Sequence, residues 1–314
     1  MTSGSRGADP IRPKRSGVLG LLPLVLALTL VWGTNWVLFP LAVGEVSVWT
    51  FRAICLLGSG SLLLTFARIQ GTSLYVPRGQ RKHLVIAALA YLVVWNIGST
   101  YSATLIPSGQ AAVLGFTMPL WATLFSWIFL GERPSGRLIM SVALASSGIA
   151  LLAFAARHSY ASAPLGFVLG LSAGVGWAAG TLVLKRVPLS VPPLVSTGWQ
   201  LLIAGVPILA VAIATGSHGS SFPSAMSVIV IGYITIIPMA LGNAAWFSIA
   251  HRLPANISGL ATVMVPIVAM VTGALVRGEP LGPIQLAAMA CCATSLLVVV
   301  VRPRHGGARD DAPA

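Results

Sequence analysis

The sequence predicts an all-α membrane protein: ten transmembrane helices, arranged as two inverted five-helix repeats with both chain ends in the cytoplasm. Three observations support this fold class: the composition, the distribution of positive charge between apolar stretches, and an internal repeat. Of the 314 residues, 56% are hydrophobic and 8% are charged. Soluble domains carry about 25% charged residues, so this chain has too little polar surface for a soluble enzyme or a disordered protein.

Ten apolar stretches approach or exceed the roughly 20 residues that a spanning helix needs. The expected spans are 17–39, 45–67, 83–105, 109–131, 137–156, 163–184, 193–215, 226–250, 256–277 and 281–301. The first stretch follows a basic segment, as a signal peptide does. This apolar stretch is longer than the apolar region of a signal peptide, and no A-x-A cleavage site follows it. We therefore expect it to be retained as the first span.

The positive charges set the orientation, because cytoplasmic loops of membrane proteins collect Lys and Arg. With the N-terminus inside, the spans place 16 of the 19 Lys and Arg residues in cytoplasmic segments. Only Arg157 and Arg277 fall in outer loops, and Arg52 lies within a span. Because these charges lie between the spans, the net charge of +13 is explained by topology, and no nucleic-acid partner is expected.

Residues 95–132 match residues 242–279 at a fixed offset of 147. The match includes Asn, Pro and Glu, whose coincidence is less common in spans than that of Leu or Ala. The matched pairs are Asn96 with Asn243, Ala103 with Ala250, Pro107 with Pro254, Pro119 with Pro266, and Gly131-Glu132 with Gly278-Glu279.

Weaker matches upstream relate Trp32 to Trp177 and Arg52 to Gln200. The predicted domains are two basic or polar tails, 1–16 and 302–314, and two repeats, 17–156 and 163–301. Each repeat has an odd number of spans, so the two must enter the bilayer from opposite sides. Secondary transporters often have this plan, with the substrate at the repeat interface near the midplane.

The same residues carry a family resemblance. Both halves have an Ala near the end of the third span, a mid-helix Pro and a terminal Gly-Glu, and the first span carries Trp32-Gly33-Thr34-Asn35. This pattern, together with Arg52 in the second span, resembles the EamA-type family of the drug/metabolite transporter superfamily. The second half departs from it in having Gln200 in place of an Arg.

The resemblance implies a ten-helix permease of the bacterial cytoplasmic (inner) membrane, which exports amino acids, other metabolites or drugs. Its partners would be a small-molecule solute and the lipid bilayer, and a homodimer is left open. We expect no cofactor and no metal.

The prolines predict where the substrate pathway lies. Pro119 and Pro266 fall about 10 residues, or about 15 Å, into their spans, which is close to the midplane. Each frees the carbonyl four residues earlier, at Gly115 and Thr262, and such carbonyls need protein or a water-filled cavity around them. We expect two kinked helices that flank a central cavity; the alternative is a kink satisfied by a neighbouring helix.

Polar side chains at shared depths complete the predicted pathway. We expect two vestibules, an outer one lined by Trp32, Asn35, Arg52 and Asn96 and an inner one lined by Trp177, Gln200 and Asn243. The alternative for Arg52 is snorkelling towards the outer interface near Glu45. The alternative for each Asn is an interhelical hydrogen bond.

Four aromatic residues lie deeper in the spans and are candidates to stack on an apolar or aromatic solute. They are Tyr91, Trp95, Trp177 and Trp246. The alternative is ordinary packing between helices.

Glu132 and Glu279 end their helices at opposite faces of the membrane, and a helix begins soon after each. The expected role is therefore to cap that next helix, with proton coupling as the alternative. A proton relay needs a titratable group within the bilayer, and here neither a carboxylate nor a histidine lies mid-span. Facilitated diffusion or exchange is the simpler hypothesis.

Other classes of function fit the sequence less well. An intramembrane enzyme needs a nucleophile with a base, a carboxylate pair or a metal cluster, and the spans supply none. The three cysteines, at 55, 291 and 292, lie in apolar runs and predict neither a disulfide nor a metal site. A carrier of phosphorylated sugars or nucleotide sugars would need several interior cations. A non-transporting assembly protein is the remaining alternative.

Overall fold

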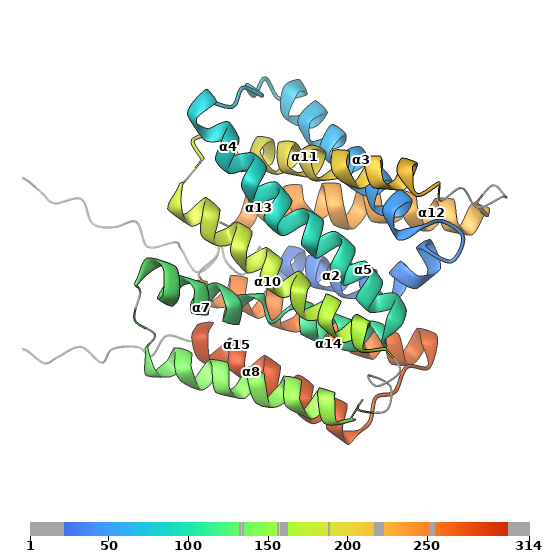
Figure 1. Ribbon diagram of the computed structural model, residues 1–314, viewed down its shortest axis with the longest axis vertical. Coiled ribbons are helices and arrows are strands. Elements are labelled where there is room, and N and C mark those ends of the chain that lie inside the picture. Colours follow the sequence, from blue (N-terminus) through green and yellow to red (C-terminus); the bar gives the residue numbers. More distant parts are fainter. Residues whose placement is uncertain are drawn as a thin grey trace, which may run out of the picture.

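The computed structural model describes residues 22–155 except 132 and 134, residue 157, residues 163–216 except 188, and residues 223–250 and 255–300. Helices and the short loops that connect them make up the described residues, which include no strand (Figure 1). The two predicted tails, 1–16 and 302–314, lie outside them, as do Glu132 and Pro254.

The helices fall into two series of matching order. The first series is α2 (Leu22–Ala42), α3 (Val48–Ile69), α4 (Arg78–Ala87), the π-helical η1 (Ala88–Val93), α5 (Val94–Leu105), α6 (Ser108–Gly115), α7 (Met118–Leu130) and α8 (Gly136–Ala155). The second series is α10 (Pro164–Arg186), α11 (Pro193–Ala214), α12 (Ala225–Ile234), the π-helical η2 (Thr235–Leu241), α13 (Gly242–Ala250), α14 (Ala255–Arg277) and α15 (Pro283–Val300).

Seven helical segments of the described chain are long and apolar enough to cross a membrane. They are Pro23–Ala42, Val48–Ile69, Arg78–Leu105, Ser108–Leu130, Pro164–Leu184, Pro193–Ala214 and Ala225–Trp246. Three shorter apolar helices, Gly136–Leu151, Met264–Arg277 and Pro283–Ser295, occupy the positions of the remaining expected spans. The chain is thus an all-helical multi-pass membrane protein.

Local sequence explains several helix ends. Ser47 accepts a hydrogen bond from the Thr50 amide and so caps the N-terminus of α3. Glycines end two other helices. Gly131 follows α7 and has φ of 69°, and its counterpart Gly278 follows α14 and has φ of 64°. Only glycine takes this left-handed conformation without strain, so the Gly of each Gly-Glu pair stops its helix.

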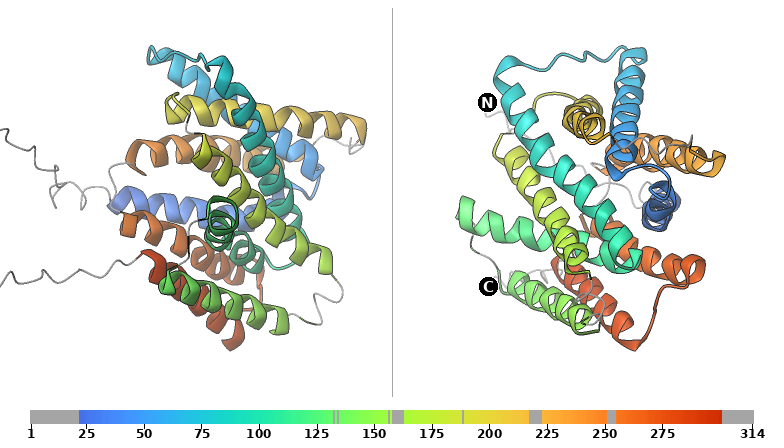
Figure 2. Two further views of the ribbon diagram at one scale, coloured as in Figure 1. Left: turned by 60° about the vertical axis from the view of Figure 1, so that its left-hand side comes forward. Right: turned by 45° about the vertical axis from the view of Figure 1, so that its right-hand side comes forward.

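The packing between the two series is reciprocal. Helix α2 of the first series packs on α14, and its counterpart α10 packs on α6 and α7. Helix α3 packs on its own counterpart α11, and α8 packs on α15. Figures 1 and 2 show the α3–α11 pair at one edge of the molecule and the α8–α15 pair at the opposite edge. The centre is left to α2, α5, α10 and the two π-helical segments.

Hydrogen bonds between loops define two ends of the bundle. At one end Gln80 bonds to Ser190 and Trp199 bonds to the Leu74 carbonyl. We call this the basic end, because it carries Arg68, Arg78, Arg81, Lys82, Arg133, Arg137 and Arg186. At the other end the Ser224 amide donates to Glu45, and Ser108 donates to Glu279.

Candidate functional site

Each half of the chain has a π-helical segment at the same place. The offset of 147 residues carries η1, which begins at Ala88, onto η2, which begins at Thr235. A π-helical turn interrupts the regular ladder of backbone hydrogen bonds and is frequent at functional sites. Sequence reasoning missed both segments. Pro238 within η2 is a local signal for one of them, but η1 contains no proline.

Asn96 and Asn243 each satisfy a carbonyl of the π-helical segment beside them. The Asn96 side-chain amide donates to the Leu92 carbonyl at 2.8 Å, and the Asn243 amide donates to the Met239 carbonyl. Leu92 and Met239 are also 147 residues apart. These hydrogen bonds lie within one helix, whereas the sequence alternative to a pathway role was a bond between helices.

The tryptophans of the first and sixth spans reach the π-helical segment of the opposite half. Trp32 in α2 donates its indole N–H to the Pro238 carbonyl of η2 at 3.1 Å. Trp177 in α10 packs edge-on against Tyr91 of η1, with ring centroids 4.7 Å apart. Trp246 lies edge-on to Trp32 at 5.7 Å. Four predicted pathway residues therefore meet at the two π-helical segments.

A chain of aromatic rings runs from Trp177 through the middle of the molecule. Trp95 lies 4.7 Å from Trp177 and 6.0 Å from Trp36, and Trp36 lies 5.6 Å from Phe39, all between ring centroids. We call these rings the aromatic core; its members are Phe39, Phe51, Tyr91, Trp95, Trp36, Phe116 and Trp177. The sequence prediction included Tyr91, Trp95 and Trp177 but missed Trp36, although Trp36 follows Trp32 by one helical turn.

Arg52 is 2% exposed and its guanidinium lies at the edge of the aromatic core. Its Cζ is 4.2 Å from the ring centroid of Phe39 and 4.8 Å from that of Phe51. Its Nε donates to the hydroxyl of Thr100. In the described part of the chain no carboxylate pairs with it; Glu45, the snorkelling alternative, accepts from Ser224 instead. A buried charge of this kind is costly and points to a functional site.

Arg52 also connects the two halves. Within the first half, the Thr100 hydroxyl that accepts from Arg52 also donates to the Asn96 carbonyl at 2.7 Å. On the other side, Nη1 of Arg52 lies 4.0 Å from the sulfur of Met239, the residue whose carbonyl Asn243 caps. One buried cation therefore contacts Met239 in η2 and is linked to η1 through Thr100 and Asn96.

Other predicted polar residues have unused hydrogen-bonding capacity. Gln200 is 4% exposed and donates to Ser196, but its Oε1 is buried with no partner among the described residues. The Oδ1 of Asn35 is likewise buried and has no hydrogen-bond partner among the described residues. Ser99 and Ser102, on the helix of Asn96, also have buried hydroxyl oxygens without a partner there, and sequence reasoning missed them.

The two matched prolines are less alike than expected. Pro266 lies within the continuous helix α14, whereas the fourth span is broken at Phe116 and Thr117, and Pro119 lies in the first turn of α7. Proline is favoured in a first turn because the amide it lacks would be unpaired there anyway. Thr117, Phe116 and Pro266 border a cavity of about 20 Å³. This space is large enough for a single water molecule.

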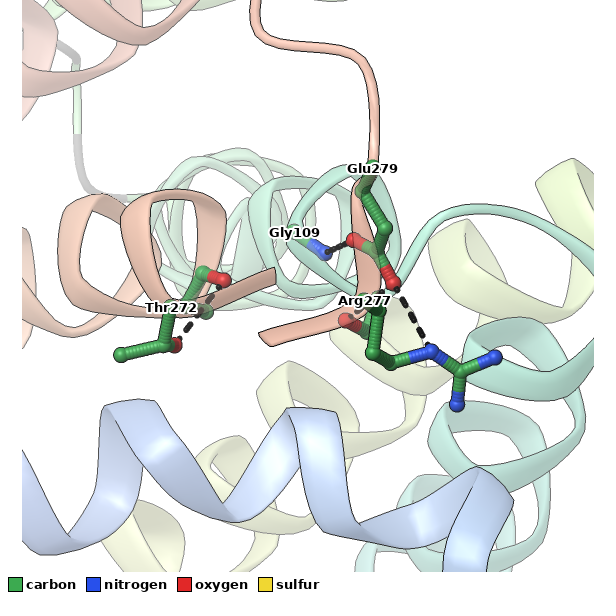
Figure 3. A network of polar contacts seen from close by, with 6 residues as sticks. Gly109, Thr272, Arg277 and Glu279 are labelled. Carbon is green, nitrogen blue, oxygen red and sulfur yellow. Dashed lines mark hydrogen bonds and ion pairs between the residues drawn. The ribbon is translucent and has the colours of Figure 1, made fainter. Parts of the chain in front are cut away.

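Glu279 caps a helix, but not the one that follows it. Its carboxylate accepts from the Ser108 hydroxyl at 2.7 Å and from the Gly109 amide at 3.2 Å, at the start of α6 (Figure 3). Arg277 lies 3.6 Å away on the same carboxylate. The expected cap on α15 is therefore replaced by a cap on the opposite half. The left-handed turn at Gly278 directly precedes this carboxylate.

Two apolar helical series, buried polar groups between them and a buried cation with no carboxylate partner among the described residues define a multi-pass membrane protein built from two related halves. The EamA-like transporter family matches this chain twice, over residues 19–154 and 164–301. The chain therefore belongs to that family and is a multi-pass transporter of the cell membrane, of the drug/metabolite transporter type. This confirms the resemblance noted in the sequence.

Relatives of known name agree with this class. The chain is 27% identical over 289 residues to the uncharacterized inner membrane transporter YedA of Escherichia coli K12, covering 90% of this chain and 92% of YedA. It is 24% identical over 301 residues to a probable amino-acid metabolite efflux pump of the same organism, covering 91% and 95%. One crystal structure matches 91% of this chain and all of its own with a TM-score of 0.64 at 18% identity, which shows the fold alone.

Proposed function

We propose that this protein is a secondary exporter of a small metabolite, an amino acid or an amphipathic compound, in the bacterial cytoplasmic membrane. The observation that supports it most is Arg52. This cation is buried, lacks a carboxylate partner in the described chain, and contacts Thr100 of the first half and Met239 in the π-helical segment of the second half. A solute carboxylate is the counter-ion that this position lacks, and its release would restore the starting state.

The proposed topology has ten crossings with both termini in the cytoplasm, and the halves inverted. It is supported by the way loops meet. Gln80 with Ser190, and Trp199 with Leu74, join loops that this topology places inside. Ser108 with Glu279 joins loops that it places outside. The reciprocal packing of the two series fits rocking of one half against the other around a fixed site.

In the proposed route, Arg52 binds the solute's anionic group, and the polar groups around it serve the rest of its polar head. Asn35, Asn96, Gln200 and Asn243 supply amide donors and acceptors, two of them with unpaired buried oxygens. The apolar part of the solute lies against aromatic rings, of which Trp32, Tyr91, Trp95, Trp177 and Trp246 belong to the predicted pathway. Pro119 lies directly after the break in the fourth span. Pro266, in the ninth span, borders the small cavity next to that break.

A single buried Arg favours a zwitterion or monocarboxylate over a phosphorylated sugar, because a phosphate carries up to two charges and usually binds several cations. The name of the efflux-pump relative supports the same substrate class. Transport by facilitated diffusion or exchange fits spans whose described residues include no Asp or Glu.

The test is an export screen. Cells that overproduce the chain are challenged with toxic amino acids, amino-acid analogues and amphipathic drugs, and efflux of each rescued compound is then measured in vesicles. Arg52→Gln is compared with Arg68→Gln, which removes an exposed cation from the same helix. We expect Arg52→Gln to lower efflux at least tenfold and Arg68→Gln to leave it near the wild-type rate. Equal rates in both variants, at equal expression, contradict the assignment of Arg52.

A further inference from the structure

The structure contains a second cavity, distant in sequence from Arg52. It has a volume of about 340 Å³ and lies where α7, the start of α8 and the end of α10 come together at the basic end. Small-molecule sites in proteins have volumes of about 300–1,000 Å³. The cavity is therefore of the right size for one small solute.

The cavity lies between two contacts that α10 makes with the fourth span. At Gly174 of α10, a β-carbon would lie 2.9 Å from the hydroxyl of Thr117, at the break before α7. Two turns further along α10, Thr181 borders the cavity together with Thr123 and Ser126 of α7. Beyond it, Arg186 at the end of α10 donates to the Phe129 carbonyl at the end of α7. The space thus lies along α10 between the Gly174 contact and the Arg186 contact.

The lining combines one cation with hydroxyl groups and apolar side chains. Arg133 lies among the lining residues and is exposed, so its charge is available at the mouth. Thr123, Ser126 and Thr181 supply three hydroxyls, and Leu138 and Leu182 supply apolar surface. A guanidinium with nearby hydroxyls recognises a carboxylate and the polar groups beside it, while the leucines suit an apolar side chain.

The equivalent position in the other half has a different neighbour. Ser126 corresponds to Gly273 at the 147-residue offset, and there the Glu279 carboxylate lies against the glycine while it caps α6. The two related positions therefore differ: Ser126 borders a cavity at the basic end, whereas a carboxylate packs against Gly273 at the opposite end.

We propose that this cavity is the cytoplasmic entry site for the transported solute, and that Arg133 selects solutes with a free carboxylate there. The inference rests on the proposed function and adds a second binding position, one that the solute occupies before it reaches Arg52. The backbone carbonyl of Trp177, one helical turn earlier on α10, accepts the hydrogen bond of the Thr181 hydroxyl, so one helical turn connects the cavity lining to a residue of the aromatic core.

The test uses single cysteines, Thr181→Cys in the cavity and Ser190→Cys in a loop of the same end, in a chain whose three native cysteines are replaced by alanine. Inside-out vesicles are treated with a membrane-impermeant maleimide, alone or with L-phenylalanine or L-phenylalaninamide. We expect both cysteines to react. L-Phenylalanine should slow the reaction at position 181 at least threefold, its amide should have little effect, and position 190 should be unaffected.

Arg133→Gln and Arg137→Gln then test the cation, because both are exposed arginines near the start of α8. Arg133→Gln should raise the L-phenylalanine concentration for half-protection about two- to fivefold, the range that an exposed ion pair supports, and Arg137→Gln should not. The inference is overturned if only a permeant reagent reaches position 181, if neither compound protects it, or if the two arginine variants behave alike. If protection is seen but the chain exports no solute, the proposed function fails and the cavity remains a binding site.

Discussion

Asn96 and Asn243, which are 147 residues apart, make the same hydrogen bond: each side-chain amide donates to the carbonyl four residues earlier, inside a π-helical segment of its own half. The two segments begin at equivalent positions, and each is contacted by a tryptophan from the first helix of the other half. This pairing indicates that the duplicated halves share an irregular backbone feature as well as a sequence pattern.

Replacement of Asn96 by Ala should destabilise the protein by about 1–2 kcal/mol, because the Leu92 carbonyl would lose its partner in a buried place. Asn243→Ala should cost less, since Asn243 is only half-buried. Thermal unfolding in detergent, followed by tryptophan fluorescence, measures both. A larger loss in Asn243→Ala than in Asn96→Ala would contradict this ranking.

Loss of the Glu279 cap should loosen the contact between the halves. Glu279→Ala should cost about 1 kcal/mol, the usual value of a helix N-cap. Ser108→Ala should be non-additive with it, because the two side chains share one hydrogen bond. Arg277→Ala is the control: its contact with Glu279 is 3.6 Å long and its side chain is 36% exposed, so little change is expected. Strict additivity of Glu279→Ala and Ser108→Ala would show that the hydrogen bond between these two side chains contributes nothing to stability.

The loop contact between Glu45 and Ser224 should make stability depend on pH in the acid range. The hydrogen bond from the Ser224 amide holds the pKa of Glu45 below its ordinary value of 4.5. Because the folded pKa is lowered, this contribution is complete above pH 4.5 and is lost as the pH falls through the folded value. Melting temperatures of the wild type and of Glu45→Gln, measured from pH 6 downwards, should converge at low pH. Parallel curves would argue against the contact.

Trp36 should matter for stability although it was not among the residues predicted from the sequence. It is 3% exposed and contacts Phe39, Trp95 and Phe116, so Trp36→Ala should cost about 3 kcal/mol through lost packing. Trp127 on α7 is 50% exposed, and Trp127→Ala should have little effect. Unfolding measured by circular dichroism in the same detergent compares them. Equal losses would mean that the aromatic core is not a packed unit.

The positions of the helices could be predicted because they depend on apolar length, and the match at offset 147 depends on Asn, Pro and Glu that each half retains. The contacts of these residues could not. Glu279 caps α6, 171 residues away, and nothing near Glu279 in the sequence indicates Ser108 as its partner. Likewise η1 contains no proline that would mark it in the sequence, and its contact with Trp177 joins residues far apart in the chain. Gly131 and Gly278 were recognised as a pattern, and their positive φ gives the physical reason.

Equilibrium binding of an exported solute to the purified protein tests the central claim most directly. The affinity of the Arg52 site, unlike cellular efflux, depends neither on the expression level nor on the transport rate. We expect Arg52→Gln to weaken the affinity for a carboxylate solute at least tenfold and to leave its amide analogue unchanged, while Arg68→Gln binds both as the wild type does. Wild-type affinity for the carboxylate in a folded Arg52→Gln protein would contradict a solute route between the two halves that passes this cation.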